Sequence, residues 1–343
     1  MSKILTHPTP QAPRTGRAVP TAVKTFARTD RQYFLGIDGG GTKTHAIITD
    51  ASYQILGEGF SGASNPLRAG LDEAVSHIQE AVAEAAAAAG LTLDQITSVC
   101  AAIAGVNHTI HYHTMKDALD RALGLDTLEL VTDARAALEG ALDGRAGVVL
   151  IAGTGSIAMG INSKGEMARS GGWGPTISDE GSGYDIARRA LKAVISSFDG
   201  RSPETSLTEI ICKRLGISNP SDLPGVIYNS DSEPVEIASL AELVAEAARN
   251  GDEVAREILA EAGRELGQLA VSVIERLELQ AESFRIACVG SVFKSGEFVL
   301  KGLRAAVERV APRAEIGPPL FPPEIGAAKL AQKRIREIET SRQ

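Results

Sequence analysis

A turn made almost entirely of glycine constrains this chain more than any other feature of its sequence. An apolar run at residues 33–37 leads into Asp38 and three consecutive glycines, and a second apolar run follows at residues 45–48. Short apolar runs of this kind are typical of buried strands, and glycine supplies the backbone freedom that a tight reversal needs. The sequence therefore predicts a β-hairpin whose turn carries almost no side chains.

The polar residues around this turn indicate a phosphate-binding loop. Backbone N–H groups without side chains can point at a phosphate, Thr and Lys add donors, and Asp38 can hold Mg²⁺ directly or through water. The Walker pattern fails by one residue, because Thr42 separates Gly41 from Lys43, and the dinucleotide fingerprint fails as well. An ordinary flexible turn is the alternative that these residues alone leave open.

The same design recurs at residues 147–160. An apolar run ends at the turn Gly153–Ser156, and a second apolar run follows it. Read alone, this turn fits a relaxed dinucleotide pattern, which should open a helix. The short apolar stretch at 157–161 and the polar turn at 162–165 favour a hairpin instead. Two strand-turn-strand phosphate motifs suggest duplicated halves that face each other across a nucleotide.

A strand that ends in a carboxylate is predicted at residues 128–133, ahead of a helix at 134–142. Asp133 has two interpretations. It fits the N-cap of that helix, where aspartate contributes about 1 kcal/mol. It also fits a general base at the carboxyl end of a strand, where ligands of open α/β sheets collect.

The most unusual stretch of the chain is residues 170–183. One Trp stands among glycines, and Asp179 and Glu180 follow in a loop ahead of a predicted helix at 184–195. Trp173 could simply fill a core, and Glu180 or Ser182 could cap the helix. The bare backbone and the carboxylates also fit a sugar site, because sugar hydroxyls need pairs of acceptors.

Taken together, six motifs resemble the N-acetylglucosamine kinases of the BadF/BadG/BcrA/BcrD ATPase family. The resemblance runs from about residue 33 to residue 330, and the motifs occur in the order that the family has. They are residues 38–44, 132–134, 153–156, 171–174, 179–183 and 289–295.

This resemblance implies the fold. The chain is expected to be an α/β protein with the two-lobe, actin-like and ribonuclease H-like ATPase fold that hexokinase shares, in which helices flank mixed sheets and the nucleotide lies between the lobes. Residues 33–143, joined by a returning helix at 323–343, are expected to form the N-terminal lobe, and residues 144–322 the C-terminal lobe. Residues 1–32 are rich in proline and poor in acids, which predicts a disordered tail.

The resemblance also implies the activity, which is transfer of the γ-phosphoryl group of ATP to the 6-hydroxyl of N-acetylglucosamine. Glucosamine, N-acetylmuramate and glucose are alternative acceptors. A more distant alternative is an iron–sulfur ATPase that activates dehydratases, but no two of the three cysteines are close in sequence. A non-catalytic sugar sensor is a further alternative.

Roles for single residues follow from the same resemblance. Asp133 is the expected catalytic base, and Asp38 is expected to support Mg²⁺. In the family an Asn at the position of Asn65 contacts the sugar, although the following Pro66 also makes this a turn by ordinary loop chemistry. The expected ATP-binding residues are Gly40, Gly41, Thr42, Lys43, Thr44, Gly153, Thr154, Gly155, Gly290, Ser291 and Ser295. The expected sugar-binding residues are Asn65, Asp133, Ser156, Gly172, Trp173, Gly174 and Asp179.

Composition narrows the partners to small molecules. The net charge is −8, and no sustained basic block follows the N-terminus, which disfavours nucleic acid. The apolar runs are too short for a membrane span, and no secretory signal is visible. Three widely spaced cysteines suit reduced thiols in the cytoplasm. A sugar is therefore the expected partner, and a homodimer is left open.

Overall fold

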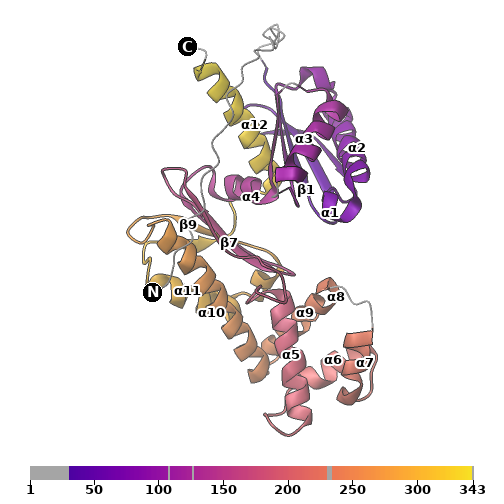
Figure 1. Cartoon of the computed structure of the whole chain (residues 1–343). Coiled ribbons are helices and arrows are strands. Elements are labelled where there is room, and N and C mark those ends of the chain that lie inside the picture. Colours follow the sequence, from indigo (N-terminus) through magenta and orange to yellow (C-terminus); the bar gives the residue numbers. More distant parts are fainter. Residues whose placement is uncertain (1–30, 107–108, 126, 230–233, 342–343) are drawn as a thin grey trace, which may run out of the picture. The chain divides into compact units, whose positions relative to one another are not determined.

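The computed structural model describes residues 31–106, 109–125, 127–229 and 234–341 (Figure 1). Residues 32–343 form one compact unit. The disordered tail predicted at 1–32 lies outside the described residues, apart from its last two. The predicted lobe bounds fall between α4 (Asp133–Leu142) and β6 (Gly147–Ala152) and at the start of α12 (Pro323–Thr340), and these bounds stay a prediction.

The first sheet contains five strands in the order β3-β2-β1-β4-β5. Strand β1 (Phe34–Gly39) pairs antiparallel with β2 (Thr44–Thr49), which confirms the first predicted hairpin. Strand β3 (Ile55–Ser61) pairs antiparallel with β2. Strands β4 (Ser98–Ile103) and β5 (Leu128–Thr132) continue the sheet parallel to β1. The carboxyl ends of β1, β4 and β5 therefore meet at one edge of the sheet.

Helices cover both faces of this sheet (Figure 1). Successive side chains of a strand point to opposite faces. One set packs against α2 (Leu71–Ala89) and α3 (Thr109–Leu123). The alternate set packs against α4 (Asp133–Leu142) and α12 (Pro323–Thr340), so the last helix of the chain returns to the first sheet. The connections contain α1 (Pro66–Ala69) and η1 (Leu93–Gln95).

The second sheet also has five strands, in the order β10-β9-β6-β7-β8. Strand β6 (Gly147–Ala152) pairs antiparallel with β7 (Ser156–Ile161), which confirms the second predicted hairpin and excludes the dinucleotide interpretation. Strand β8 (Met167–Gly171) extends the hairpin. On the other side, β9 (Arg285–Val289) lies parallel to β6, and β10 (Glu315–Gly317) lies parallel to β9.

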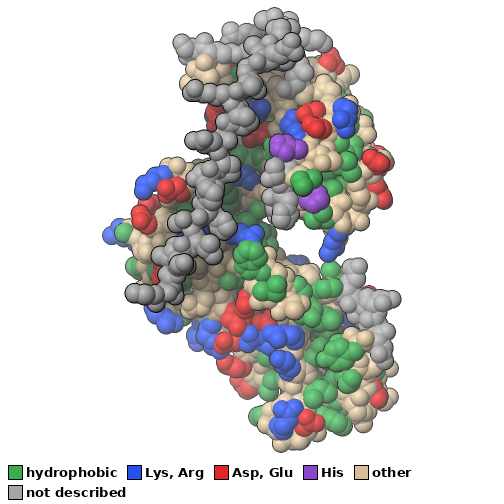
Figure 2. All heavy atoms as spheres, in the orientation of Figure 1, with side chains coloured by type: hydrophobic (Ala, Val, Ile, Leu, Met, Phe, Trp, Pro, Cys, Tyr) green, Lys and Arg blue, Asp and Glu red, His purple; other side chains and the backbone are tan. Residues whose placement is uncertain are grey.

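The largest buried cluster joins the second sheet to the helices that follow it. On the face that Figure 2 shows, basic and acidic side chains lie next to each other over these helices. The helices of this half are α5 (Gly183–Phe198), α6 (Leu207–Leu215), η2 (Pro220–Asp222), α7 (Leu223–Asn229), α8 (Pro234–Ser239), α9 (Ala241–Arg249), α10 (Glu253–Arg276), η3 (Ser291–Ser295) and α11 (Glu297–Glu308).

Helix α4 contacts both sheets. Ala136 packs in the cluster that α12 forms on the first sheet. Leu138 and Leu142 pack against Val149 and Met159 of the second sheet. The helix that begins at Asp133 is therefore fixed from both sides. Within the described ranges, no helix is long and apolar enough to cross a membrane.

Candidate active site

Asp38 and Asp133, the two carboxylates predicted to act in the site, lie at the carboxyl edge of the first sheet. Asp38 is near the end of β1, Gly105 follows β4, and Asp133 follows β5. The strand register sets Gly39 beside Ile103 and Ile103 beside Thr132, so these three chain segments leave the sheet side by side. The edge of an α/β sheet at the carboxyl ends of its strands is the usual place for a ligand.

The first glycine turn is closed by its own backbone. The Gly40 N–H donates to Lys43 O at 2.9 Å. The Gly40 carbonyl accepts the N–H groups of Ser64 and Asn65, both at 3.0 Å, which fixes the following loop against the turn. The side chains of Thr42 and Lys43 are exposed. The turn therefore presents backbone, a hydroxyl and an ammonium group to a ligand, as the phosphate-loop interpretation requires.

Thr44, which was expected to bind ATP, has its side chain in use elsewhere. The residue is fully buried, and its hydroxyl donates to Gly62 O at 2.7 Å and lies 2.8 Å from Ser64 Oγ. These contacts tie the loop at residues 62–65 to the hairpin. Thr44 thus supports the loop beside the turn. The predicted contact of its side chain with ATP stays a prediction, and these hydrogen bonds do not favour it.

We expect Thr44→Val to lower the melting temperature, because it leaves Gly62 O without its buried partner at a cost of about 1–3 kcal/mol. Thermal unfolding followed by circular dichroism measures the loss. Thr42→Val is the matched control, since the Thr42 side chain is exposed and makes no comparable contact. Equal melting temperatures for the two variants would contradict this account of Thr44.

Asp38 lies among other charged groups. The pKa of its carboxyl is raised to about 6, mainly by burial and also by the carboxylates of Glu324 and Asp133, while Lys43 and His45 act to lower it. The strand register places both aspartates at the same edge of the first sheet, with β4 between their strands. An ionised carboxylate in this position gains from a bound cation.

The residues fit Mg²⁺ held mainly by its substrate. Among the described residues no group of three or more His, Cys, Asp or Glu could form a metal cage. Mg²⁺ at phosphoryl-transfer sites is commonly bound by one or two carboxylates, water and the phosphates themselves. Asp38, next to the phosphate loop, is the residue that would hold it in this way.

Asp38→Asn should raise the melting temperature of the metal-free protein at pH 7.5. The pKa of Asp38 is raised from its usual 3.8 to about 6. Between these values the native state binds more protons than the unfolded state, so the free energy of unfolding falls as the pH rises. The gain from Asp38→Asn should therefore be present above pH 6 and absent below about pH 4. Thermal unfolding in EDTA across this range tests it, and a pH-independent difference would refute the assignment.

Asp133 is half-buried at the start of α4. Burial raises the pKa of its carboxyl, and the hydrogen bond that it accepts from Ala134 N–H at 2.9 Å lowers it. The N-cap is Thr132, whose Oγ1 accepts the Arg135 N–H at 3.3 Å, so the N-cap interpretation of Asp133 is wrong. A carboxylate with a raised pKa at this edge is suited to accept a proton.

The side chain of Asn65 is held by a hydrogen bond from Leu67 and by close packing against Gly105. Its Oδ1 accepts the Leu67 N–H at 2.9 Å and caps α1. This confirms the alternative in which Asn65 makes an ordinary turn contact through its side-chain oxygen. The amide packs so closely on Gly105 that a Cβ there would lie 2.4 Å from Oδ1. The Nδ2 group remains as a donor at the carboxyl edge of the sheet. The predicted sugar contact of Asn65 could use this donor or the second lone pair of Oδ1.

The second glycine turn is held by Asp179. Asp179 is buried in a left-handed backbone conformation, and its carboxylate accepts the backbone N–H groups of Ser156 and Gly174. A Cβ on Gly155 would lie only 2.7 Å from Asp179 Oδ2. Burial raises the pKa of Asp179 despite these hydrogen bonds. Ser156 is also occupied, because its hydroxyl donates to Glu180 O at 2.7 Å. Both residues support the turn directly, and their predicted contact with sugar stays a prediction.

The glycine-rich stretch ends against α5. Ser182 is the N-cap of α5, as the alternative interpretation proposed, and it accepts the Asp185 N–H at 3.1 Å. The Gly183 N–H donates to Gly153 O at 2.7 Å, which joins the helix to the second glycine turn. Trp173, between Gly172 and Gly174, is 63 % exposed, so the core-filling interpretation is wrong. The Arg169 guanidinium lies 4.1 Å from the centre of its ring.

A cavity of about 420 Å³ joins two of the expected ATP-binding stretches. Gly153 and Thr154 of the second turn lie on one side, and Ser291 and Ser295 of η3 lie on another. Gly290 lies against the end of β6, where a Cβ would come within 2.2 Å of Ala152 O. Val292 and Lys294 of the predicted motif at 289–295 also line the cavity. The remaining walls, which the sequence did not predict, are Ile186, Val235, Ala238, Ser239, Ala241, Glu242, Ala245 and Arg249.

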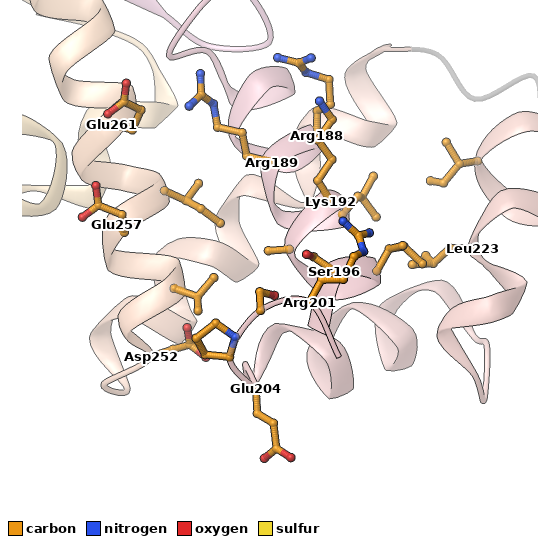
Figure 3. A pocket seen from close by; sticks show the side chains of 18 of the residues that line it. Arg188, Arg189, Lys192, Ser196, Arg201, Glu204, Leu223, Asp252, Glu257 and Glu261 are labelled. Carbon is orange, nitrogen blue, oxygen red and sulfur yellow. The ribbon is translucent and has the colours of Figure 1, made fainter. Parts of the chain in front are cut away.

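A larger cavity, about 1490 Å³, lies between α5, α7 and α10 (Figure 3). None of the expected site residues lines it. Its basic residues are largely neutralised, since Arg188 and Arg189 bind Asp185 and Arg201 binds Asp199. The smaller cavity carries bare backbone and hydroxyls, which are the groups that a nucleotide needs. We therefore assign the active site to the glycine turns and not to the larger cavity.

Comparison with known proteins identifies the family of this chain. The model of the BadF/BadG/BcrA/BcrD ATPase family matches residues 35–331. An N-acetylmuramic acid/N-acetylglucosamine kinase of Clostridium acetobutylicum is 37% identical over 286 residues, which cover 83% of this chain and 93% of that protein. An N-acetyl-D-glucosamine kinase of Dictyostelium discoideum is 33% identical over 312 residues, covering 88% and 98%.

A solved structure supports the same fold. A candidate N-acetylglucosamine kinase of Chromobacterium violaceum superimposes with a TM-score of 0.69 at 27% identity, covering 87% of this chain and 98% of that one. Two mixed sheets, each with a glycine hairpin, thus define an actin-like ATPase of the sugar-kinase type. The chain belongs to the BadF/BadG/BcrA/BcrD ATPase family. The predicted fold class and the predicted family are confirmed.

Proposed function

We propose that this chain is an ATP-dependent amino-sugar kinase that transfers the γ-phosphoryl group of ATP to the 6-hydroxyl of N-acetylglucosamine. One observation supports this proposal above the others. A half-buried carboxylate, Asp133, and the carboxylate of Asp38 lie at one edge of the first sheet, where the glycine turn suited to phosphate also begins. A base, a metal-supporting acid and a phosphate loop are the parts that such a reaction requires.

The nucleotide would lie against both glycine turns. The turn at residues 39–44 and the turn at residues 153–156 would hold the phosphates, and the cavity beside η3 would hold the nucleoside. Phosphoryl transfer depends mainly on positioning and charge stabilisation, and bound Mg²⁺ supplies much of that charge. Asp38 would hold the ion near the phosphates. Lys43, in the same turn, lowers the pKa of Asp38 through its positive charge.

The sugar would lie at the carboxyl edge of the first sheet. Asn65 and the backbone of the turn at residues 172–174 would orient its hydroxyls, and Asp133 would accept the proton of the attacking 6-hydroxyl. The pKa of Asp133 is raised by burial, which makes the carboxylate a stronger base than an exposed aspartate. Asp179 would contact the sugar, and its carboxylate also holds the second glycine turn in place.

The acceptor is the part that needs a direct test. The Clostridium acetobutylicum relative is named for both N-acetylmuramic acid and N-acetylglucosamine, so N-acetylmuramate is the second candidate. We would measure ATP consumption with Mg²⁺ and N-acetylglucosamine, N-acetylmuramate, glucosamine, glucose or no sugar. The proposal requires strong stimulation by N-acetylglucosamine. Stimulation by another sugar alone would change the acceptor, and hydrolysis indifferent to every sugar would refute the kinase.

We also propose that the reaction takes place in the cytoplasm. All three cysteines are free, and burial raises the pKa of each thiol above its usual value, so they are poorly reactive. Free thiols suit a reducing cytoplasm, where ATP is available. A homodimer remains compatible with this proposal, which needs residues of one chain only.

A further inference from the structure

Arg68, to which the sequence assigns no role, lies over the first glycine turn. It belongs to α1, the short helix that follows Asn65. A Cβ on Gly41 would lie 3.3 Å from Arg68 Cδ and 3.5 Å from its Nη1. The guanidinium therefore passes directly across the bare backbone of Gly41, and it can do so because Gly41 has no side chain.

Hydrogen bonds fix Arg68 relative to that turn. The Gly40 carbonyl accepts the N–H groups of Ser64 and Asn65, and the Asn65 carbonyl accepts the N–H groups of Arg68 and Ala69, each at 3.0 Å. Two successive backbone hydrogen bonds, through Asn65, thus connect the backbone of Arg68 to Gly40. A cation carried on such a short, braced connection is held near the turn and does not depend on a long flexible loop.

The Arg68 side chain makes no ion pair or hydrogen bond with any residue in the described ranges. Other arginines of the chain are mostly engaged, as Arg135 is with Glu139, Arg189 with Asp185 and Arg264 with Glu257. An exposed arginine without a partner is ordinarily just solvated. Here, however, the unpartnered guanidinium lies on a turn that presents backbone N–H groups, with Lys43 two residues beyond Gly41.

We propose that the Arg68 guanidinium binds oxygens of the γ-phosphoryl group of ATP and stays on that group while it moves to the sugar oxygen. This inference rests on the proposed function. Arg68 follows Asn65, the expected sugar contact, by three residues, and it also overlies the phosphate turn. If ATP and the sugar bind as proposed, the guanidinium would lie near both donor and acceptor, where charge develops during transfer. The planar guanidinium matches phosphate oxygens in a bidentate manner.

The test compares nucleotides that differ only at the γ-position. Calorimetric titration with Mg²⁺ would give the affinities of Arg68→Gln for AMP-PNP and for ADP. Loss of one charge-assisted contact predicts about 10-fold weaker AMP-PNP binding or more, with ADP changed less than about 2-fold. The kcat with N-acetylglucosamine should fall about 10²-fold. Arg68→Lys should recover part of both losses because it restores the charge.

The matched control is Arg121→Gln. Arg121 is an exposed arginine in the last turn of α3, ahead of β5, and thus at the opposite edge of the first sheet from the turn. This variant should leave both affinities and kcat unchanged, and both variants should unfold at the wild-type temperature.

Two results would overturn the inference. One is unchanged AMP-PNP affinity in Arg68→Gln, and the other is an equal loss for AMP-PNP and ADP, which would move the contact away from the γ-phosphoryl group. The binding arm needs no sugar. A wild-type protein that transfers phosphate to no sugar would therefore refute the proposed function, while the AMP-PNP and ADP affinities would still decide the role of Arg68.

Discussion

Asp133→Asn lowers the turnover of N-acetylglucosamine by about 10²-fold or more, because the amide cannot accept the proton of the attacking hydroxyl. The substitution preserves shape and the hydrogen bond from the Ala134 N–H, which the amide oxygen can still accept. Affinity for ADP and for the sugar should therefore survive. Steady-state kinetics gives the loss of kcat, and calorimetric titration gives the two affinities.

The control for this experiment is Asp117→Asn. Asp117 is an exposed acid on α3, and its removal changes the net charge by the same amount. Its turnover should match the wild type. Near-normal turnover of Asp133→Asn would remove this residue as the base, and an equal loss in both variants would attribute the effect to net charge.

Gly290→Ala abolishes nucleotide binding and lowers the melting temperature. Gly290 has φ +117°, and a Cβ there would lie 2.2 Å from Ala152 O, which is backbone and cannot move aside. Such overpacking costs about 1–3 kcal/mol beyond the strain of the conformation itself. The turn must shift away from β6, and the cavity wall at Ser291 shifts with it. ADP titration and thermal unfolding measure the two effects.

Gly296→Ala separates the clash from the conformational strain. Gly296 also has a positive φ, of +62°, but no atom lies within 4 Å of its Cβ position. It should therefore lose some stability and keep its affinity for ADP. Equal effects of the two substitutions would show that backbone conformation alone matters and would contradict the packing of the Gly290 turn on β6.

Local patterns predicted those elements whose ends carry strong local signals. The spacing of apolar residues and the closing Gly90 predict a helix at residues 71–89, and α2 has these bounds because Gly90 takes the left-handed conformation that ends it. Both hairpins were predicted from glycine turns between apolar runs. The order β3-β2-β1-β4-β5 was not, since strand pairing depends on contacts far apart in the sequence. The apolar spacing at residues 237–250 predicts one helix, but the structure has α8 and α9 there. They are separated at Leu240, where the Leu243 N–H donates to Leu240 O and makes a tighter turn.

Residue types were enough to locate the loops of the site, but they did not show what each side chain does there. Thr44, Ser156 and Asp179 have the donors and acceptors that a ligand needs, yet each satisfies the backbone of a neighbouring loop. Sequence shows which groups a residue has, and only the fold shows which of them are already paired.

The cavity wall from α8 and α9 was missed for a different reason. Residues such as Glu242 and Arg249 stand in a segment whose spacing is typical of an ordinary amphipathic helix. Arg68 was missed because a single basic residue in a polar loop carries no pattern. The cavity wall and Arg68 can be recognised only from the residues that lie next to them in the folded structure.

The position of the transferred phosphate tests the account most directly. The protein would be incubated with ATP, Mg²⁺ and N-acetylglucosamine, and the product analysed by ³¹P and ¹³C NMR. We predict one phosphate monoester on the 6-carbon oxygen, formed in equal amount to ADP, and no such product with Asp133→Asn over the same time. Inorganic phosphate with unmodified sugar, or phosphate on another oxygen, would contradict the proposed function.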